Sequence, residues 1–449
     1  MSLRQARRTD VPEHLVPWAV AATLLAAVGV VASVWRPTAP AAVPVATDLD
    51  SFEPAVLAVV DAYRGPRYVA AFAGTAVGVA VPVLVATTRV GQRWVQRLAG
   101  PRAHAPWRAG LVAGTVAVAT SIAVLPIAVW IGVVHDGRWG FRTQGPGAWL
   151  ADRALVSSGR WLGVAAAAMV LVVVMRRWPR SWPYRVTVLG TATAAVLVLL
   201  HPVLFQPLRL TTTPLPPGET RAVVEEVVAA SHVPGVPLLV GDASRRTTRV
   251  NAFVTGLGPT ERVVLYDTLL ALPPEQVAAI VAHELAHHEH RDLERGVLLV
   301  ATALLPSSLL LRRILATGWA TSVARARGPT DPRLIAVVLA AVAVLEVVGQ
   351  PAANLVSRRL EAAADARAVE MTGDPATFVR TARVFTVRDL SAPDPPPAVR
   401  FLFATHPSIG ERIRQAAALS DDPAALPAVA DLRADERAIE HAAIRADPP

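Results

Sequence analysis

The segment VAHELAHHEH, residues 281–290, gathers four histidines and two glutamates in an otherwise aliphatic stretch. His283 and His287 are four residues apart, so on a helix both imidazoles project from one face and can bind the same metal ion. Glu284 would reach a metal-bound water as general base. A chance match to this pattern anywhere in the chain is expected roughly 1% of the time. The alternative, a hydrated helix end with fortuitous histidines, is therefore less favoured.

A catalytic zinc site needs three protein ligands and an open position for water. His290 cannot be the third ligand, because it lies about 10 Å along the helix from His283. The metzincin pattern would place Gly at position 290 and His at 293, where this chain has His290 and Leu293. Glu361 in SRRLEAAAD is the best candidate, and Asp365, one turn further, could accept a hydrogen bond from a ligand histidine. Alone, an ExxxD pattern is usually a solvated acidic face.

The composition indicates a membrane protein. Hydrophobic residues make up 53% of the 449 residues, charged residues 18%, and the mean hydropathy is +0.41. The chain has no cysteine, which excludes disulfides, thiolate metal sites and cysteine nucleophiles. The formal charge is +9, but the arginines form short clusters between apolar runs. Such clusters are typical of membrane flanks and argue against nucleic-acid binding.

Seven apolar stretches have about the length that crosses a bilayer. They lie near residues 15–35, 68–88, 111–134, 161–175, 186–206, 296–311 and 334–350. The first could instead be a cleaved signal peptide, but its apolar core of about 21 residues is longer than usual, which favours a retained span.

The arginine distribution predicts the orientation in the cell membrane. With seven spans, the N-terminus and the loops 89–110, 176–185 and 312–333 share one side and carry 17 arginines, whereas the opposite short loops carry 7. The positive-inside bias then places the N-terminus in the cytoplasm and the polar, catalytic regions outside it.

The polar segments 207–295 and 351–420 lie on the same membrane side, because two spans separate them. They are expected to build one domain. A membrane region at 1–206 precedes this domain in sequence, the spans at 296–350 interrupt it, and a tail at 421–449 follows it. Short β-branched or aromatic runs at 236–240, 249–256 and 262–266 predict a small sheet. Helices are predicted at 218–232, around HELAH, at 355–371, at 374–390 and after THPS.

Four segments together resemble a known family, the integral-membrane zinc metallopeptidases that include the type I CAAX prenyl endopeptidases and the bacterial HtpX proteases. They are NAFVTG (251–256), HELAH (283–287), SRRLEAAAD (357–365) and THPSIGERI (405–413), in the family's order. Five spans before HELAH and two after it are similar to the CAAX-type branch. HtpX proteins are shorter, with fewer leading spans.

The resemblance implies a mainly α, polytopic fold, with seven transmembrane helices around a water-filled chamber. A zincin-like (gluzincin) metallopeptidase domain with a small β-sheet closes the chamber. The family's single Zn²⁺ would be bound by His283, His287 and Glu361, with Glu284 as base.

The resemblance also gives roles to three further residues. His406 matches a family histidine that helps to stabilise the tetrahedral intermediate; without the family it could equally be a histidine that opens a helix before Pro407. Asn251 and Ala252 would lie on the edge strand with which the substrate backbone pairs.

We therefore expect a membrane-embedded zinc metalloendopeptidase, whose partners are a peptide or protein substrate and the lipid bilayer. The alternatives are an HtpX-like protease for membrane-protein quality control and a non-catalytic, zinc-stabilised membrane scaffold. A transporter finds little support in the spans. No feature of the sequence implies a prenylated substrate, and the eukaryotic CAAX-type branch turns its catalytic domain to the cytosol, opposite to the side predicted here.

Overall fold

The computed structural model describes residues 52–434, except 102–104, 234, 257–259, 421–425 and 429. The predicted span at 15–35 lies outside these residues. In the described part, six helices are long and apolar enough to cross a membrane, and each overlaps one of the other six predicted spans. They are Pro54–Thr87, Pro106–Arg138, Pro146–Arg177, Trp182–Leu204, Asp292–Leu315 and Pro332–Thr372. The prediction of a mainly helical, multi-pass membrane protein is confirmed.

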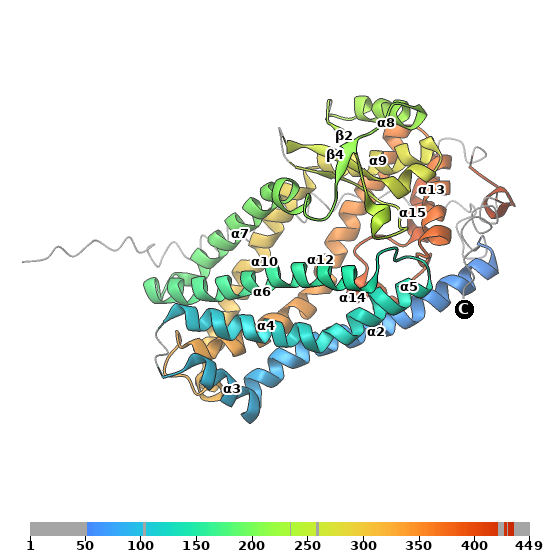
Figure 1. Ribbon diagram of the computed structural model, residues 1–449. Coiled ribbons are helices and arrows are strands. Elements are labelled where there is room, and N and C mark those ends of the chain that lie inside the picture. Colours follow the sequence, from blue (N-terminus) through green and yellow to red (C-terminus); the bar gives the residue numbers. More distant parts are fainter. Residues whose placement is uncertain are drawn as a thin grey trace, which may run out of the picture.

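Helices α2 (Pro54–Thr87), α4 (Pro106–Val129) and α6 (Pro146–Arg177) form a layer of long helices. Helices α7 (Trp182–Leu200) and α10 (Asp292–Leu315) pack together beside it. Helix α12 (Ile335–Thr372), the longest of the described helices, rises from this layer towards the sheet (Figure 1). Large apolar side chains such as Ile122 and Leu162 are 62% and 71% exposed, as expected of surfaces that face lipid.

The predicted sheet is present and has four strands, in the order β1-β2-β4-β3. Strands β2 (Leu238–Gly241) and β4 (Arg262–Tyr266) are parallel, and β3 (Ala252–Thr255) pairs antiparallel with β4. Strand β1 (Thr212–Pro214), which we did not predict, pairs antiparallel with β2. Among the described strands, β3 is therefore an edge of the sheet.

Helices α8 (Glu219–Ala230), α9 (Pro274–Glu289), α13 (Pro375–Arg388) and α15 (Ile409–Ala418) gather around the sheet (Figure 1). Their shared core includes Val263, Leu265, Val281 and Leu285, all fully buried. Because α9 is fixed along this core, the direction of its remaining face, which carries the histidines, is fixed as well.

Local signals set the ends of these helices. Gly373 ends α12 with a left-handed φ of 61°, and Asp374 then caps α13 by accepting a hydrogen bond from Thr377 N. Ser408 and Glu411 form a capping box at the start of α15. The short helix α14 (Pro397–Phe403) lies between α13 and α15 in sequence.

Candidate active site

The structure brings His283 and His287 of α9 together with Glu361 of α12. Their ligand atoms can hold one metal ion. The two imidazole Nε2 atoms are 3.2 Å apart, and the Glu361 carboxylate oxygens lie 3.3 Å from His283 Nε2 and 3.6 Å from His287 Nε2. Helix α10 and the first part of α12 lie between these residues in sequence, so the site depends on how two spans return the chain to α9.

A carboxylate faces the other ring nitrogen of each histidine. Asp365 Oδ1 lies 2.8 Å from His283 Nδ1, and Asp292 Oδ2 is hydrogen-bonded to His287 Nδ1 at 2.8 Å. Such pairs leave Nε2 available as a ligand and fix the ring orientation. Asp365 is itself held by two hydrogen bonds from Arg412 of α15, at 2.6 and 2.9 Å.

The acidic surroundings of the site favour positive charge. Burial lowers the pKa of His287, but hydrogen bonds with Asp292 and Glu361 outweigh it and raise that pKa to about 10. A bound cation would take the place of the proton held there. Burial also raises the pKa of Glu284, although the imidazoles of His283 and His287 counteract it. Such a shift suits a carboxylate that must accept and return a proton.

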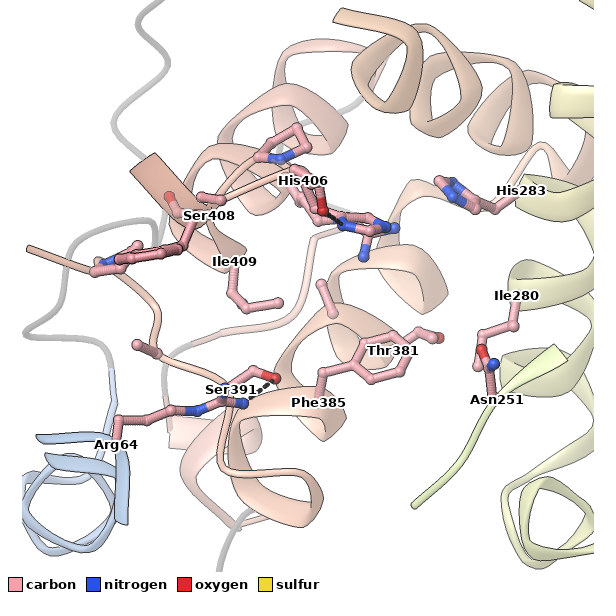
Figure 2. A pocket seen from close by; sticks show the side chains of 18 of the residues that line it. Arg64, Asn251, Ile280, His283, Thr381, Phe385, Ser391, His406, Ser408 and Ile409 are labelled. Atoms are coloured by element: carbon pink, nitrogen blue, oxygen red, sulfur yellow. Dashed lines mark hydrogen bonds between the residues drawn. The ribbon is translucent and has the colours of Figure 1, made fainter. Parts of the chain in front are cut away.

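A pocket of about 470 Å³ opens beside Glu284, within the range of ligand-binding pockets. In Figure 2, His283 and Asn251 approach it from the α9 and β3 side, His406 from the loop before α15, and Arg64 from α2. Much of its wall is apolar: Ile280, Phe378, Ala382, Phe385, Val399 and Ile409. A smaller pocket of about 290 Å³ is lined by Glu284, His287 and Glu361.

The remaining predicted site residues have different positions. His406 Nε2 lies 3.3 Å from Glu361 Oε1, and its ring is exposed at the pocket. Asn251 also lines the pocket, directly before edge strand β3. Ala252, the first residue of β3, is buried as a whole residue, with 2% of its surface exposed.

Two supporting residues of the site, Asp292 and Arg412, were not predicted from the sequence. The chain turns at Arg291, which has a left-handed φ of 56°, and this turn brings Asp292 back onto His287. Arg412 lies within the THPSIGERI segment, so that motif could have identified it as a candidate site residue. That Arg412 pairs with Asp365 can be seen only from the packing of α15 against α12.

The comparisons with known proteins agree with this geometry. Residues 214–420 match peptidase family M48. The metalloprotease YhfN of Bacillus subtilis is 28% identical over 306 residues, which cover 66% of this chain and 70% of that protein. A CAAX prenyl protease 1 homolog of Arabidopsis thaliana is 29% identical, with the same coverage. The crystal structure of S. mikatae Ste24p has the same fold: its TM-score is 0.71 at 18% identity, covering 89% of this chain and 97% of that one.

The fold and the matches define a multi-pass membrane metallopeptidase. The matched segment, residues 214–420, contains all the candidate site residues, and the chain is similar to CAAX prenyl proteases and HtpX proteases. The predicted class of enzyme, a metalloprotease that hydrolyses peptide bonds, is confirmed.

An ion pair between Glu289 and Arg367 ties the end of α9 to α12, with N–O distances of 2.8 and 3.4 Å. Burial alone would raise the pKa of Glu289, but hydrogen bonds from Arg367 and His232 hold it at about 2. Because this folded pKa lies below the ordinary value of 4.5, the pair stabilises the fold above about pH 4.5 and loses that effect as the pH falls towards 2.

We expect Arg367→Gln to destabilise the protein by about 1 to 3 kcal/mol at pH 7. In thermal unfolding of the purified protein, its Tm deficit should shrink as the pH falls below 4.5. Arg245→Gln, which removes an exposed partner of Asp242, should leave the Tm nearly unchanged. An Arg367→Gln deficit that is the same at pH 7 and pH 4 would contradict this account of the pair.

Proposed function

We propose that this metallopeptidase is a zinc endopeptidase with His283, His287 and Glu361 as its protein ligands. The observation that supports this most strongly is the close approach of the donor atoms. The two imidazole Nε2 atoms are 3.2 Å apart, Glu361 Oε2 lies 3.3 Å from His283 Nε2, and Glu361 Oε1 lies 3.6 Å from His287 Nε2. Two atoms bound about 2.0 Å from a tetrahedral ion are about 3.3 Å apart, so these separations are of the size that a zinc site requires. Two imidazoles and one carboxylate are also a common donor set of catalytic zinc.

When bound, zinc supplies Lewis acidity that polarises the scissile carbonyl and lowers the pKa of a water. Glu284 takes the proton of the attacking water and passes it to the departing amine. The raised pKa of Glu284 helps the first step, because a more basic carboxylate takes the proton of the water more readily. His406 stands at the pocket beside Glu361, where its ring can donate a hydrogen bond to the developing oxyanion.

The substrate backbone pairs with β3. This strand is hydrogen-bonded to β4 on one side, and Asn251 at its start lines the pocket. An extended peptide added to this edge would run past Glu284, with its alternate side chains directed into the pocket. This mode selects extended chains and gives no reason to require a prenyl group.

Metal removal tests the cofactor. Incubation of the purified protein with 1,10-phenanthroline should lower peptide cleavage by more than about 100-fold, because the chelator removes the ion that activates the water. The non-chelating isomer 1,7-phenanthroline is the control. Zn²⁺ should restore cleavage and Mg²⁺ should not, since Mg²⁺ prefers six oxygen ligands. Cleavage that survives chelation, or that only Mg²⁺ restores, would overturn the zinc assignment.

We further propose that the catalytic domain faces outward from the cytoplasm, on the basis of the arginine-rich loops at the opposite membrane side. The chain has no cysteine, so single introduced cysteines report their own exposure. In intact cells, Arg245→Cys should react with a membrane-impermeant maleimide and Arg327→Cys should react only after lysis. The reverse labelling pattern would show that the catalytic domain faces the cytoplasm, and it would leave the proposed catalytic mechanism unchanged.

A further inference from the structure

Helix α3 (Arg89–Ala99) lies at the end of the molecule away from α9 and the sheet (Figure 1). Arg89, Arg93 and Arg97 are spaced one turn apart, so they form a single stripe along the helix. All three are exposed. In the described part of the chain, none of them has an ion-pair or hydrogen-bond partner for its side chain.

A second, apolar stripe runs beside the arginines. Val90 is 76% exposed, and Trp94 and Leu98, at the following turns, are partly exposed. A third stripe of Gly91 and Val95 is buried, and Gly91 fits so closely against α2 that a side chain there would meet the Val85 backbone. Helix α3 is thus fixed to the bundle with a cationic stripe and an apolar stripe both facing outward.

The neighbouring segments carry charge of the same sign. Residues 89–110, 176–185 and 312–333 contain 14 arginines and a single acidic residue, Asp331. They meet at this end, because α3 and α11 (Gly318–Ala324) both contact η8 (Pro332–Leu334). Hydrogen bonds from Arg176 to Thr330 O and from Arg312 to Arg180 O join the loops further. This end therefore has a large excess of positive charge.

We propose that the outward face of α3, formed by Arg89, Arg93 and Arg97 with Val90 and Trp94, binds anionic phospholipids. Guanidinium groups pair with lipid phosphates in a bidentate manner, and the apolar stripe enters the acyl boundary. A nucleic acid or an acidic protein would satisfy the arginines but not the exposed apolar stripe between them and the spans. Lipid binding at α3 does not depend on the zinc site.

The test measures the binding of phosphatidylglycerol to the full-length protein in a neutral detergent. Native mass spectrometry and the rise in Tm on adding the lipid are the two readouts. Replacing the stripe in Arg89→Gln/Arg93→Gln/Arg97→Gln should weaken binding at least about 10-fold, and 0.5 M salt should weaken binding to the wild type. If that variant does not accumulate, Arg93→Gln alone should give about a 5-fold loss.

The matched control is Arg138→Gln/Arg153→Gln/Arg209→Gln, which removes the same charge from exposed arginines outside this end. It should bind phosphatidylglycerol as the wild type does. The proposal would be overturned if the α3 variant bound phosphatidylglycerol as tightly as the wild type does. It would also be overturned if the control lost as much binding as the α3 variant. So would a Tm rise of the same size with inorganic phosphate, because the site would then recognise a free anion and not a lipid.

Discussion

Glu284→Gln is expected to lower kcat/KM for peptide cleavage by at least about 1,000-fold, since glutamine cannot accept the proton of the attacking water. The substitution is nearly isosteric, and Glu284 is not among the three candidate ligands. The variant should therefore keep one metal ion per chain and the Tm of the wild type. Cleavage of a fluorogenic peptide and metal analysis of the same sample measure both quantities.

Glu275→Gln is the matched control, because it makes the same change at an exposed position of the same helix. It should leave cleavage and metal content unchanged. A Glu284→Gln variant with the activity of the wild type would remove Glu284 as base. A wild-type protein that binds the metal but cleaves no peptide would instead favour the zinc-stabilised scaffold.

Glu361→Ala is expected to abolish both metal binding and cleavage. Two imidazoles on one helix hold zinc weakly without the third donor, so the ion content after dialysis should fall below about a tenth of an ion per chain. The fold should largely persist, because α12 is held by its packing against α2, α4 and α9. Metal analysis and circular dichroism distinguish lost ligation from unfolding.

The control for this variant is Glu370→Ala, on the same helix but with a side chain that is 61% exposed. It should keep both metal and activity. If Glu361→Ala retained a full complement of zinc, another donor would have to complete the site, and the proposed ligand set would be wrong.

The membrane part of the fold was largely predictable, but the lengths of its helices were not. Spans expected at 161–175 and 296–311 belong to the longer helices Pro146–Arg177 and Asp292–Leu315. Charged residues near their ends, such as Arg160 and Glu294, reduce the local hydropathy without ending the helix. Likewise, α12 continues through Pro351, where two separate helices were expected. Hydropathy reports contact with lipid, whereas packing decides where a helix stops.

The part of the site that lies on a single helix was predictable from the sequence. The spacing of His283 and His287 follows from helical periodicity, and the position of Glu361 follows from the family motif. Asp292 lies on the far side of a left-handed turn at Arg291, and β1 has only three residues, one of them a proline. Neither leaves a periodic signal, because each is determined by tertiary contacts.

Anomalous diffraction at the zinc absorption edge, from crystals of the full-length protein, tests the central claim most directly. The account predicts one strong peak about 2 Å from His283 Nε2, His287 Nε2 and a carboxylate oxygen of Glu361, with no fourth protein ligand. A peak bound elsewhere, or one that leaves Glu361 several ångströms away, would contradict it.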